Sequence, residues 1–172
     1  MNLQSDDFEL FGLVQRFAQD RAAVDARWKE LQREAHPDKF AAHGAAAQRL
    51  AMQWSVRINE AYQRLKDPLS RAAYLCELNG APVNAENNTA MPAAFLMQQM
   101  EWREELEDAK SVEAVEAISR QISAARTAAL DQCGQLIDAN RDFPGAIAQV
   151  RALMFIERFA HDVEMRLDQL GQ

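Results

Sequence analysis

The chain has 172 residues, of which 48% are hydrophobic and 26% charged, so it is long enough to bury a core as one mid-sized domain or two small ones. Its formal net charge of −7 is unevenly placed, because residues 1–80 carry 11 basic and 11 acidic side chains whereas residues 81–172 carry 8 and 15. The acidic balance argues against nucleic acid as a partner, and the unequal halves suggest two units with different partners.

Four helices are predicted in residues 1–80, because Ala, Leu, Gln, Glu and Arg dominate between the prolines. The second helix must end before Pro37, since the residue preceding a proline is pushed out of the α region. We expect Asp67 to cap the fourth helix, with Pro68 in its first position. The helices span about 8–18, 20–35, 45–66 and 69–78. The inner face of the third is expected to consist of Leu50, Trp54, Ile58, Ala61 and Leu65.

Three longer helices are predicted in the second half, at about 92–109, 111–139 and 144–169. The Asn-rich stretch 81–91 is typical of a polar linker. Helices of this length, joined by short turns, favour an antiparallel three-helix bundle. The predicted fold class is therefore all-α, with a helical unit over 1–80, a linker over 81–91 and a C-terminal three-helix bundle over 92–172.

The N-terminus and the two cysteines indicate a reducing compartment. Residues 1–7 contain no apolar core of signal-peptide length, and no apolar run approaches the length of a membrane span. Cys76 and Cys133 lie too far apart for a close-spaced ligand pair, and two thiols cannot form a four-thiolate site. We therefore expect a cytoplasmic protein with no membrane partner, in which both cysteines are free and pack in helices.

A His-Pro-Asp turn joins the second and third helices. Pro37 fixes its own φ and extends the residue before it, which holds His36 and Asp38 in a rigid, exposed turn. A fixed carboxylate is a good target for an arginine of another protein. Lys29 and Arg33 lie four residues apart on the side of the second helix opposite its apolar stripe, so they form a small basic patch beside the turn.

Plainer explanations compete for this turn. His-Pro-Asp alone is a common break between helices, and a basic helix face is often simply solvated. A metal site could use His36, Asp38 and His43, although no second cluster of ligands supports it. Catalysis by His36 and Asp38 would need a nucleophile or pocket that the sequence does not identify, and the chain has no phosphate-binding glycine-rich loop.

The surroundings of the turn resemble a J-domain over residues 6–78. The similar segments are Leu10-Phe11-Gly12-Leu13, Ile58-Asn59-Glu60-Ala61-Tyr62, and the set Asp67, Pro68, Arg71 and Tyr74. J-domain proteins dock on DnaK-type chaperones and stimulate their ATP hydrolysis, for which the His-Pro-Asp turn is required. The resemblance implies that residues 1–80 form a J-domain and that the protein is a cofactor of another protein's ATPase, not an enzyme. It assigns the chaperone contact to His36, Pro37 and Asp38, supported by Lys29, Arg33 and Lys39.

The first helix of the second unit has two apolar faces. On a helical wheel, the sector that a bundle would bury holds Phe95, Trp102, Leu106 and Ala109. A different sector holds Leu96, Met97 and Met100, flanked by Arg103 and Glu104. A three-helix bundle buries one stripe per helix, so the second face is surplus to its core. Methionines suit a surface that adapts to a partner, and a charged rim around apolar side chains is usual at interfaces.

The last helix repeats this pattern. Its core stripe consists of Leu153, Ile156, Ala160, Val163 and Leu167. Ile147, Val150 and Met154 lie on the opposite side, and Phe155 lies off the stripe. These extra apolar residues either bury against the N-terminal unit or form a site for a partner, and the pattern alone favours neither.

A second resemblance, to the HscB-type J-proteins of iron–sulfur cluster assembly, lies in Phe95-Leu96-Met97-Gln98-Gln99-Met100-Glu101-Trp102-Arg103-Glu104-Glu105-Leu106. The stretch 67–75 is similar to the same family. In that family the C-terminal bundle binds the scaffold protein on which clusters are built, and a specialised DnaK-type chaperone receives it. The resemblance therefore implies an HscA-like chaperone and an IscU-like scaffold as partners, with no cofactor or metal. It assigns the scaffold contact to Leu96, Met97 and Met100, with Arg103, Glu104 and Phe155 nearby.

Departures from this family pattern are small. Gln98 stands where the family usually has an acidic residue, and Met91-Pro92 stands where it has polar or charged residues. The N-terminal cysteine pairs of the eukaryotic relatives are missing, so a bacterial-type member without zinc is the closer match. The alternatives are a general J-protein with a different client and, more distantly, a metal-dependent enzyme built on the histidines and aspartate of the turn region.

Overall fold

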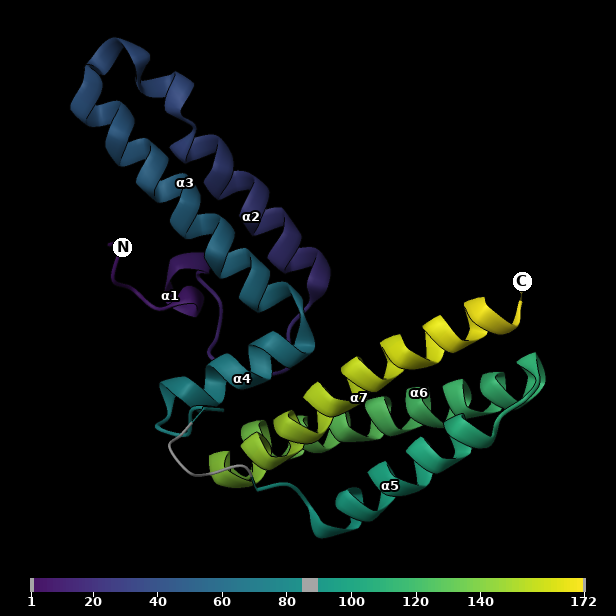
Figure 1. Ribbon diagram of the computed structural model, residues 1–172. Coiled ribbons are helices and arrows are strands. Elements are labelled where there is room, and N and C mark those ends of the chain that lie inside the picture. The colour runs from purple at the N-terminus through teal and green to yellow at the C-terminus, as the bar shows by residue number, and fades with distance from the viewer. Residues whose placement is uncertain (1, 85–89, 172) are drawn as a thin grey trace. The chain divides into compact units, whose positions relative to one another are not determined.

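The structure is a computed structural model that describes residues 2–84 and 90–171 (Figure 1). Within these ranges every regular element is a helix, which confirms the all-α class. The chain divides into two compact units, Met1–Leu75 and Cys76–Gln172. Residues 85–89 of the expected linker lie outside the described residues, and the domain limits at 80 and 91 stay predictions. In the described part of the chain, no helix is both long and apolar enough to cross a bilayer.

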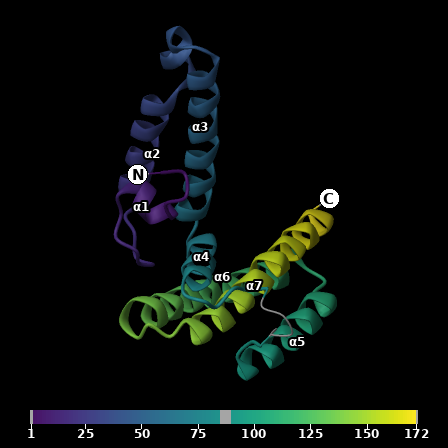
Figure 2. The same ribbon diagram turned by 90° about the vertical axis from the view of Figure 1, so that its left-hand side faces the viewer.

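The N-terminal unit is built on a helical hairpin. Two of its helices, α2 and α3, lie side by side and run in opposite directions, and a 3-10 helix, η1, joins them (Figures 1 and 2). The expected cap by Asp67 is confirmed, since its side chain accepts a hydrogen bond from the Ser70 amide. Asp20 caps α2 in the same way by accepting one from the Ala22 amide. In chain order the elements are α1 (Asp7–Phe11), α2 (Arg21–Ala35), η1 (Pro37–His43), α3 (Ala45–Lys66) and α4 (Pro68–Leu78).

Two expectations for this unit were wrong. The first helix ends at Phe11 rather than near residue 18, because Gly12 adopts a left-handed conformation with φ 65° that stops it. Leu50 is 49% exposed, whereas it was expected on the inner face of α3. Ala51 is buried instead, because it lies seven residues, or two helical turns, before the buried Ile58.

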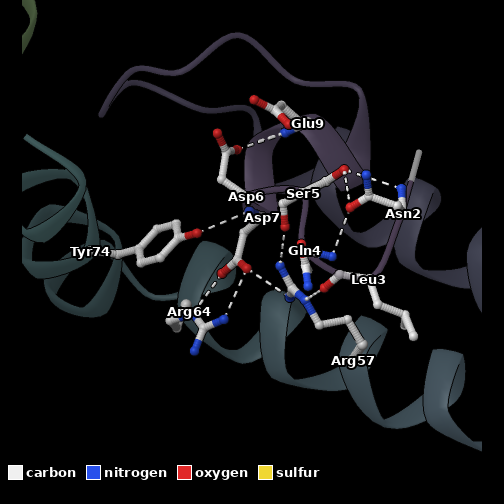
Figure 3. A network of polar contacts seen from close by, with 10 residues as sticks. All are labelled: Asn2, Leu3, Gln4, Ser5, Asp6, Asp7, Glu9, Arg57, Arg64 and Tyr74. Atoms are coloured by element: carbon white, nitrogen blue, oxygen red, sulfur yellow. Dashed lines mark hydrogen bonds and ion pairs between the residues drawn. The ribbon is translucent and has the colours of Figure 1, made fainter.

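A buried carboxylate ties the N-terminal segment to α3 and α4 (Figure 3). Asp7 is fully buried, and its two oxygens lie 2.6 and 2.9 Å from the Arg64 guanidinium and 2.8 Å from that of Arg57. The Asp7 amide donates to the Tyr74 hydroxyl, and Arg57 also donates to the Ser5 carbonyl. A buried charge is tolerated when it is paired and hydrogen-bonded, so this network holds α1 in place against the hairpin.

Replacing Asp7 with Asn is expected to destabilise the N-terminal unit by about 3 kcal/mol, because it leaves the largely buried Arg57 without its counter-charge. Urea denaturation followed by circular dichroism measures the loss. Glu30→Gln is the matched control, since Glu30 pairs with Arg27 at the surface and such pairs contribute about 1 kcal/mol at most. Equal losses in the two variants would contradict a special role for the buried carboxylate.

In the described residues of the C-terminal unit, aromatic rings join α5 to α7, and Trp102 Nε1 of α5 donates to Gln121 of α6 at 3.3 Å. The helices α6 and α7 lie side by side in opposite directions (Figures 1 and 2). Trp102 of α5 stacks on Phe159 of α7 with centroids 6.1 Å apart, and Phe159 stacks on Phe155 at 5.6 Å. The predicted three-helix bundle is therefore confirmed. Its elements are α5 (Ala93–Asp108), α6 (Val112–Gly134), a π-helical turn (Gln135–Ala139) and α7 (Phe143–Leu170).

Both cysteines are free thiols buried in this unit. The Cys76 Sγ lies 3.8 Å from the Phe143 carbonyl oxygen, and the Cys133 Sγ lies 4.0 Å from that of Ala146. Burial raises the pKa of Cys76 to about 11 and the pKa of Cys133 to about 12. Both thiols are therefore uncharged at neutral pH and pack as small apolar groups.

The two thiols are expected to resist iodoacetamide in the folded protein at about pH 8, because the thiolate is the reactive form and the raised pKa values suppress it. In the unfolded chain both thiols have a pKa of about 8.5, so they are labelled faster in the unfolded chain than in the folded protein. By the same linkage, the free energy of unfolding falls as the pH rises above that value. Mass spectrometry measures the labelling, and labelling of the folded protein at the unfolded rate would contradict the burial.

Candidate functional site

The His-Pro-Asp turn lies where α2 meets η1, at one end of the hairpin (Figure 1). His36 is extended, with φ −61° and ψ 128°, and Pro37 begins η1. The Asp38 amide donates to His36 Nδ1 at 3.3 Å, and the Lys39 amide donates to the His36 carbonyl at 3.0 Å. Local hydrogen bonds and the proline thus fix the turn, which continues as a 3-10 helix.

The turn presents its charged groups to solvent. The Asp38 side chain is 92% exposed, and its Oδ2 lies 3.7 Å from His36 Nδ1, which is too far for a strong ion pair. Lys39 is exposed beside it, and Pro37 is half-buried. A carboxylate this open on a rigid backbone can accept a charge-assisted, bidentate contact from an arginine of another protein.

The basic patch lies on α2 next to the turn. Lys29 and Arg33 are both exposed, and Arg33 Nε donates to the Lys29 carbonyl at 3.5 Å, so the two side chains follow each other along one face. Six residues were expected at a chaperone contact. Four of them lie in the turn, namely His36, Pro37, Asp38 and Lys39. The other two, Lys29 and Arg33, lie on the neighbouring part of α2. Their contact with a chaperone stays a prediction.

His43, which the alternative metal site would require, lies against the Phe40 ring, with centroids 5.9 Å apart. It is exposed at the far end of η1, away from the local contact between His36 and Asp38. Over residues 2–84 and 90–171, no three His, Cys, Asp or Glu side chains are grouped closely enough to hold a metal ion. The geometry therefore gives this alternative no support.

An apolar patch is exposed on α5. Leu96, Met97 and Met100 are 50%, 68% and 66% exposed, and we call these three residues the methionine patch. Phe95, which precedes them, turns inward and packs edge-on against Trp102, whose side chain is buried. The helix therefore has both apolar faces that the wheel predicted, one in the core and one in water. Such an exposed group of large apolar side chains is typical of a partner site.

Arg103 and Glu104, the charged side chains expected beside the methionine patch, lie in different surroundings. The Arg103 guanidinium lies 5.2 Å from the centroid of the Phe155 ring, a cation–π contact. Phe155 is only 6% exposed and packs edge-on against Phe95 at 5.7 Å, so it belongs to the core next to the patch. The structure brings Arg103 and Phe155 together, whereas Glu104 lies on the side of α5 that faces α6.

A hollow between α5 and α6 collects acidic side chains that no motif predicted. It has a volume of about 540 Å³, and Ile118 of α6 forms part of its wall. Its acidic residues are Glu101, Glu104, Glu105 and Asp108 of α5. Their spacing of three, four and seven residues from the first is the signal that would have indicated a shared face. The side of α5 that faces α6 is thus strongly acidic in the second half of the helix.

The second apolar set on α7 is mostly buried. Ile147 and Val150 are 3% and 0% exposed, and Met154 is 36% exposed. Phe155 is 6% exposed, so three of the four side chains that were left open between burial and a partner site are buried. The methionine patch on α5 is the more accessible apolar surface.

Known proteins are similar to this chain over nearly its whole length. Residues 91–164 match the family model described as the HSCB C-terminal oligomerisation domain. The Co-chaperone protein HscB homolog of Burkholderia mallei is 49% identical over 99% of this chain and 98% of its own. Among solved structures, chaperone HscB from Vibrio cholerae has a TM-score of 0.79 at 39% identity, covering 96% of this chain and 99% of its own. The human co-chaperone protein HscB has a TM-score of 0.87 at 26% identity, and the match covers 96% of this chain and 84% of the human chain.

Proposed function

Since the chain belongs to the HscB family of iron–sulfur co-chaperones, we propose that it binds a cluster scaffold protein and delivers it to a DnaK-type chaperone whose ATPase it stimulates. The chaperone in this proposal is HscA-like and the scaffold is IscU-like. The protein itself catalyses no reaction, because ATP hydrolysis takes place on the chaperone. The free cysteines fit the reducing cytoplasm in which we propose that it acts.

The proposal depends on one observation: each of the two units exposes a surface, and the two surfaces differ in chemical character. The turn of the N-terminal unit offers a rigid carboxylate, Asp38, followed by the exposed Lys39 and preceded on α2 by the exposed Arg33. The C-terminal unit offers the methionine patch. Charged groups on a fixed backbone suit selective, electrostatically steered docking, and flexible apolar side chains suit a folded client.

Joining the two surfaces in one chain gives the mechanism its advantage. A scaffold held by the C-terminal unit is presented to the chaperone at a high effective concentration once the turn has engaged that chaperone. Neither contact then has to be tight by itself. The two surfaces also lie in halves of different charge, the N-terminal half balanced and the C-terminal half acidic.

Recruitment to an immobilised scaffold tests the adaptor role. Scaffold fixed to a biosensor surface is expected to capture the ATP-bound chaperone when the chain is present and to capture much less without it. Asp38→Asn is the control, since it leaves the methionine patch intact and should bind the scaffold without recruiting the chaperone. Equal capture with and without the chain would contradict delivery.

A further inference from the structure

An apolar cavity opens in the hairpin directly behind the His-Pro-Asp turn. Its volume is about 330 Å³, and Leu50, which is 49% exposed, connects it to solvent. Glu34 supplies a polar wall. Its large apolar wall residues are Leu10 of α1 and, from the hairpin, Leu31, Phe40, Leu50, Trp54 and Ile58.

This cavity is not ordinary core packing. Protein interiors contain few voids larger than a water molecule, whereas this space has the size of a small ligand pocket. Further from the turn the gap between α2 and α3 is closed, because Trp28 stacks on Tyr62 at 4.5 Å and donates from Nε1 to Asn59. The hairpin is therefore tightly packed along part of its length and open at the end that carries the turn.

The cavity and the turn are parts of one surface. Ala35 precedes the turn and Phe40 follows it, and both are wall residues of the cavity. A protein that contacts His36 and Asp38 must therefore lie over or beside the opening. Burying the exposed parts of Leu50 and Phe40 under such a protein would stabilise the complex, since apolar area removed from water contributes favourably.

We propose that the cavity receives an apolar side chain of the same DnaK-type chaperone that the turn engages, an inference that rests on the proposed function. The exposed cations next to the wall residues, Arg33, Lys39 and Arg49, outnumber the nearby carboxylates of Glu34 and Asp38. The incoming apolar side chain is therefore flanked by acidic residues of the chaperone. The turn supplies the stimulating contact, and the cavity supplies affinity through a buried anchor.

The test is the concentration of the chain that half-maximally stimulates the chaperone's ATPase. Ala47→Leu fills the cavity from its wall without adding charge or removing an apolar contact, and Leu50→Asp places a carboxylate at its opening. Each change is expected to raise the half-maximal concentration about tenfold or more. The rate at saturation should stay near that of the unchanged protein, because the turn is intact. Circular dichroism and scaffold binding verify that both variants are folded.

Met52→Asp is the matched control, because Met52 is 57% exposed on the same helix but is not a wall residue. It is expected to stimulate like the unchanged protein. An unshifted half-maximal concentration for Ala47→Leu would overturn the inference, and so would equal shifts for Leu50→Asp and Met52→Asp. Either result leaves the proposed function standing if Asp38→Asn still removes stimulation, whereas an unchanged protein that fails to stimulate would overturn both.

Discussion

Asp38→Asn is expected to remove the stimulation of chaperone ATPase activity while leaving the fold intact. The side chain is 92% exposed and makes no strong ion pair within the turn, so its loss of charge should change the free energy of unfolding by about 0.5 kcal/mol or less. In the complex the same change removes a charge-assisted contact and leaves a cation of the chaperone unpaired, at a cost of about 2–5 kcal/mol. That range corresponds to about 30-fold or more in affinity for the stimulated state.

The matched control is Glu60→Gln, which removes one exposed carboxylate from α3 of the same unit. It should stimulate the ATPase like the unchanged protein, because Glu60 does not belong to the turn. Single-turnover ATP hydrolysis by the chaperone at rising co-chaperone concentration provides the comparison. Full stimulation by the Asp38→Asn variant, with an unchanged thermal transition, would refute the assignment of the turn.

Changing Leu96, Met97 and Met100 together to Ala is expected to weaken scaffold binding by about 3 kcal/mol or more, which is more than a hundredfold. All three side chains are at least half exposed, and together they form the methionine patch. Alanine is the strongest helix former, so α5 should remain folded. Calorimetric titration with the scaffold measures the affinity, and basal stimulation of the chaperone should be unaffected.

Met165→Ala is the control for loss of an exposed methionine in the same unit, since Met165 is 50% exposed on α7 and outside the methionine patch. Its scaffold affinity should match that of the unchanged protein. If the triple variant also bound the scaffold with unchanged affinity, the exposed apolar face of α5 would have to serve another partner.

The fold could be predicted where the signals are local. Prolines and capping side chains fix helix ends within a few residues, which is why α2, α3 and α4 begin and end close to the predicted positions. The His-Pro-Asp turn is similarly local, because Pro37 and the backbone around it determine its shape. The predicted end of the first helix was wrong for an equally local reason. Gly12 adopts a left-handed conformation that ends the helix, and the apolar pattern of the sequence does not indicate it.

Long-range polar contacts could not be predicted. Asp7 meets Arg64 across 57 residues, and no periodicity in the sequence marks either residue as buried. Arg151, which is 6% exposed, donates to the carbonyls of Val83 and Ala90, a pairing that depends on the packed bundle. Buried charges of this kind break the rule that charged residues face water, so only the folded structure reveals them.

The predicted scaffold contact contains residues whose burial or exposure could be predicted from local sequence and one whose burial could not. The exposure of Leu96, Met97 and Met100 follows from a helical wheel, because one face of α5 is surplus to the core. The burial of Phe155 could not be read from the wheel of α7, since it depends on Phe95 and Arg103 of another helix. Phe155 therefore supports the patch from the core, and its own contact with a scaffold stays a prediction.

The steady-state ATPase rate of the chaperone, measured with this chain in the presence and absence of the scaffold, tests the adaptor mechanism most directly. The mechanism predicts that the chain alone raises the rate and that chain and scaffold together raise it above the sum of their separate effects. A rate that rises with the chain but does not change when the scaffold is added would contradict delivery of the scaffold to the chaperone. It would fit a general J-protein with a different client. A rate that the chain leaves unchanged would contradict the mechanism as a whole.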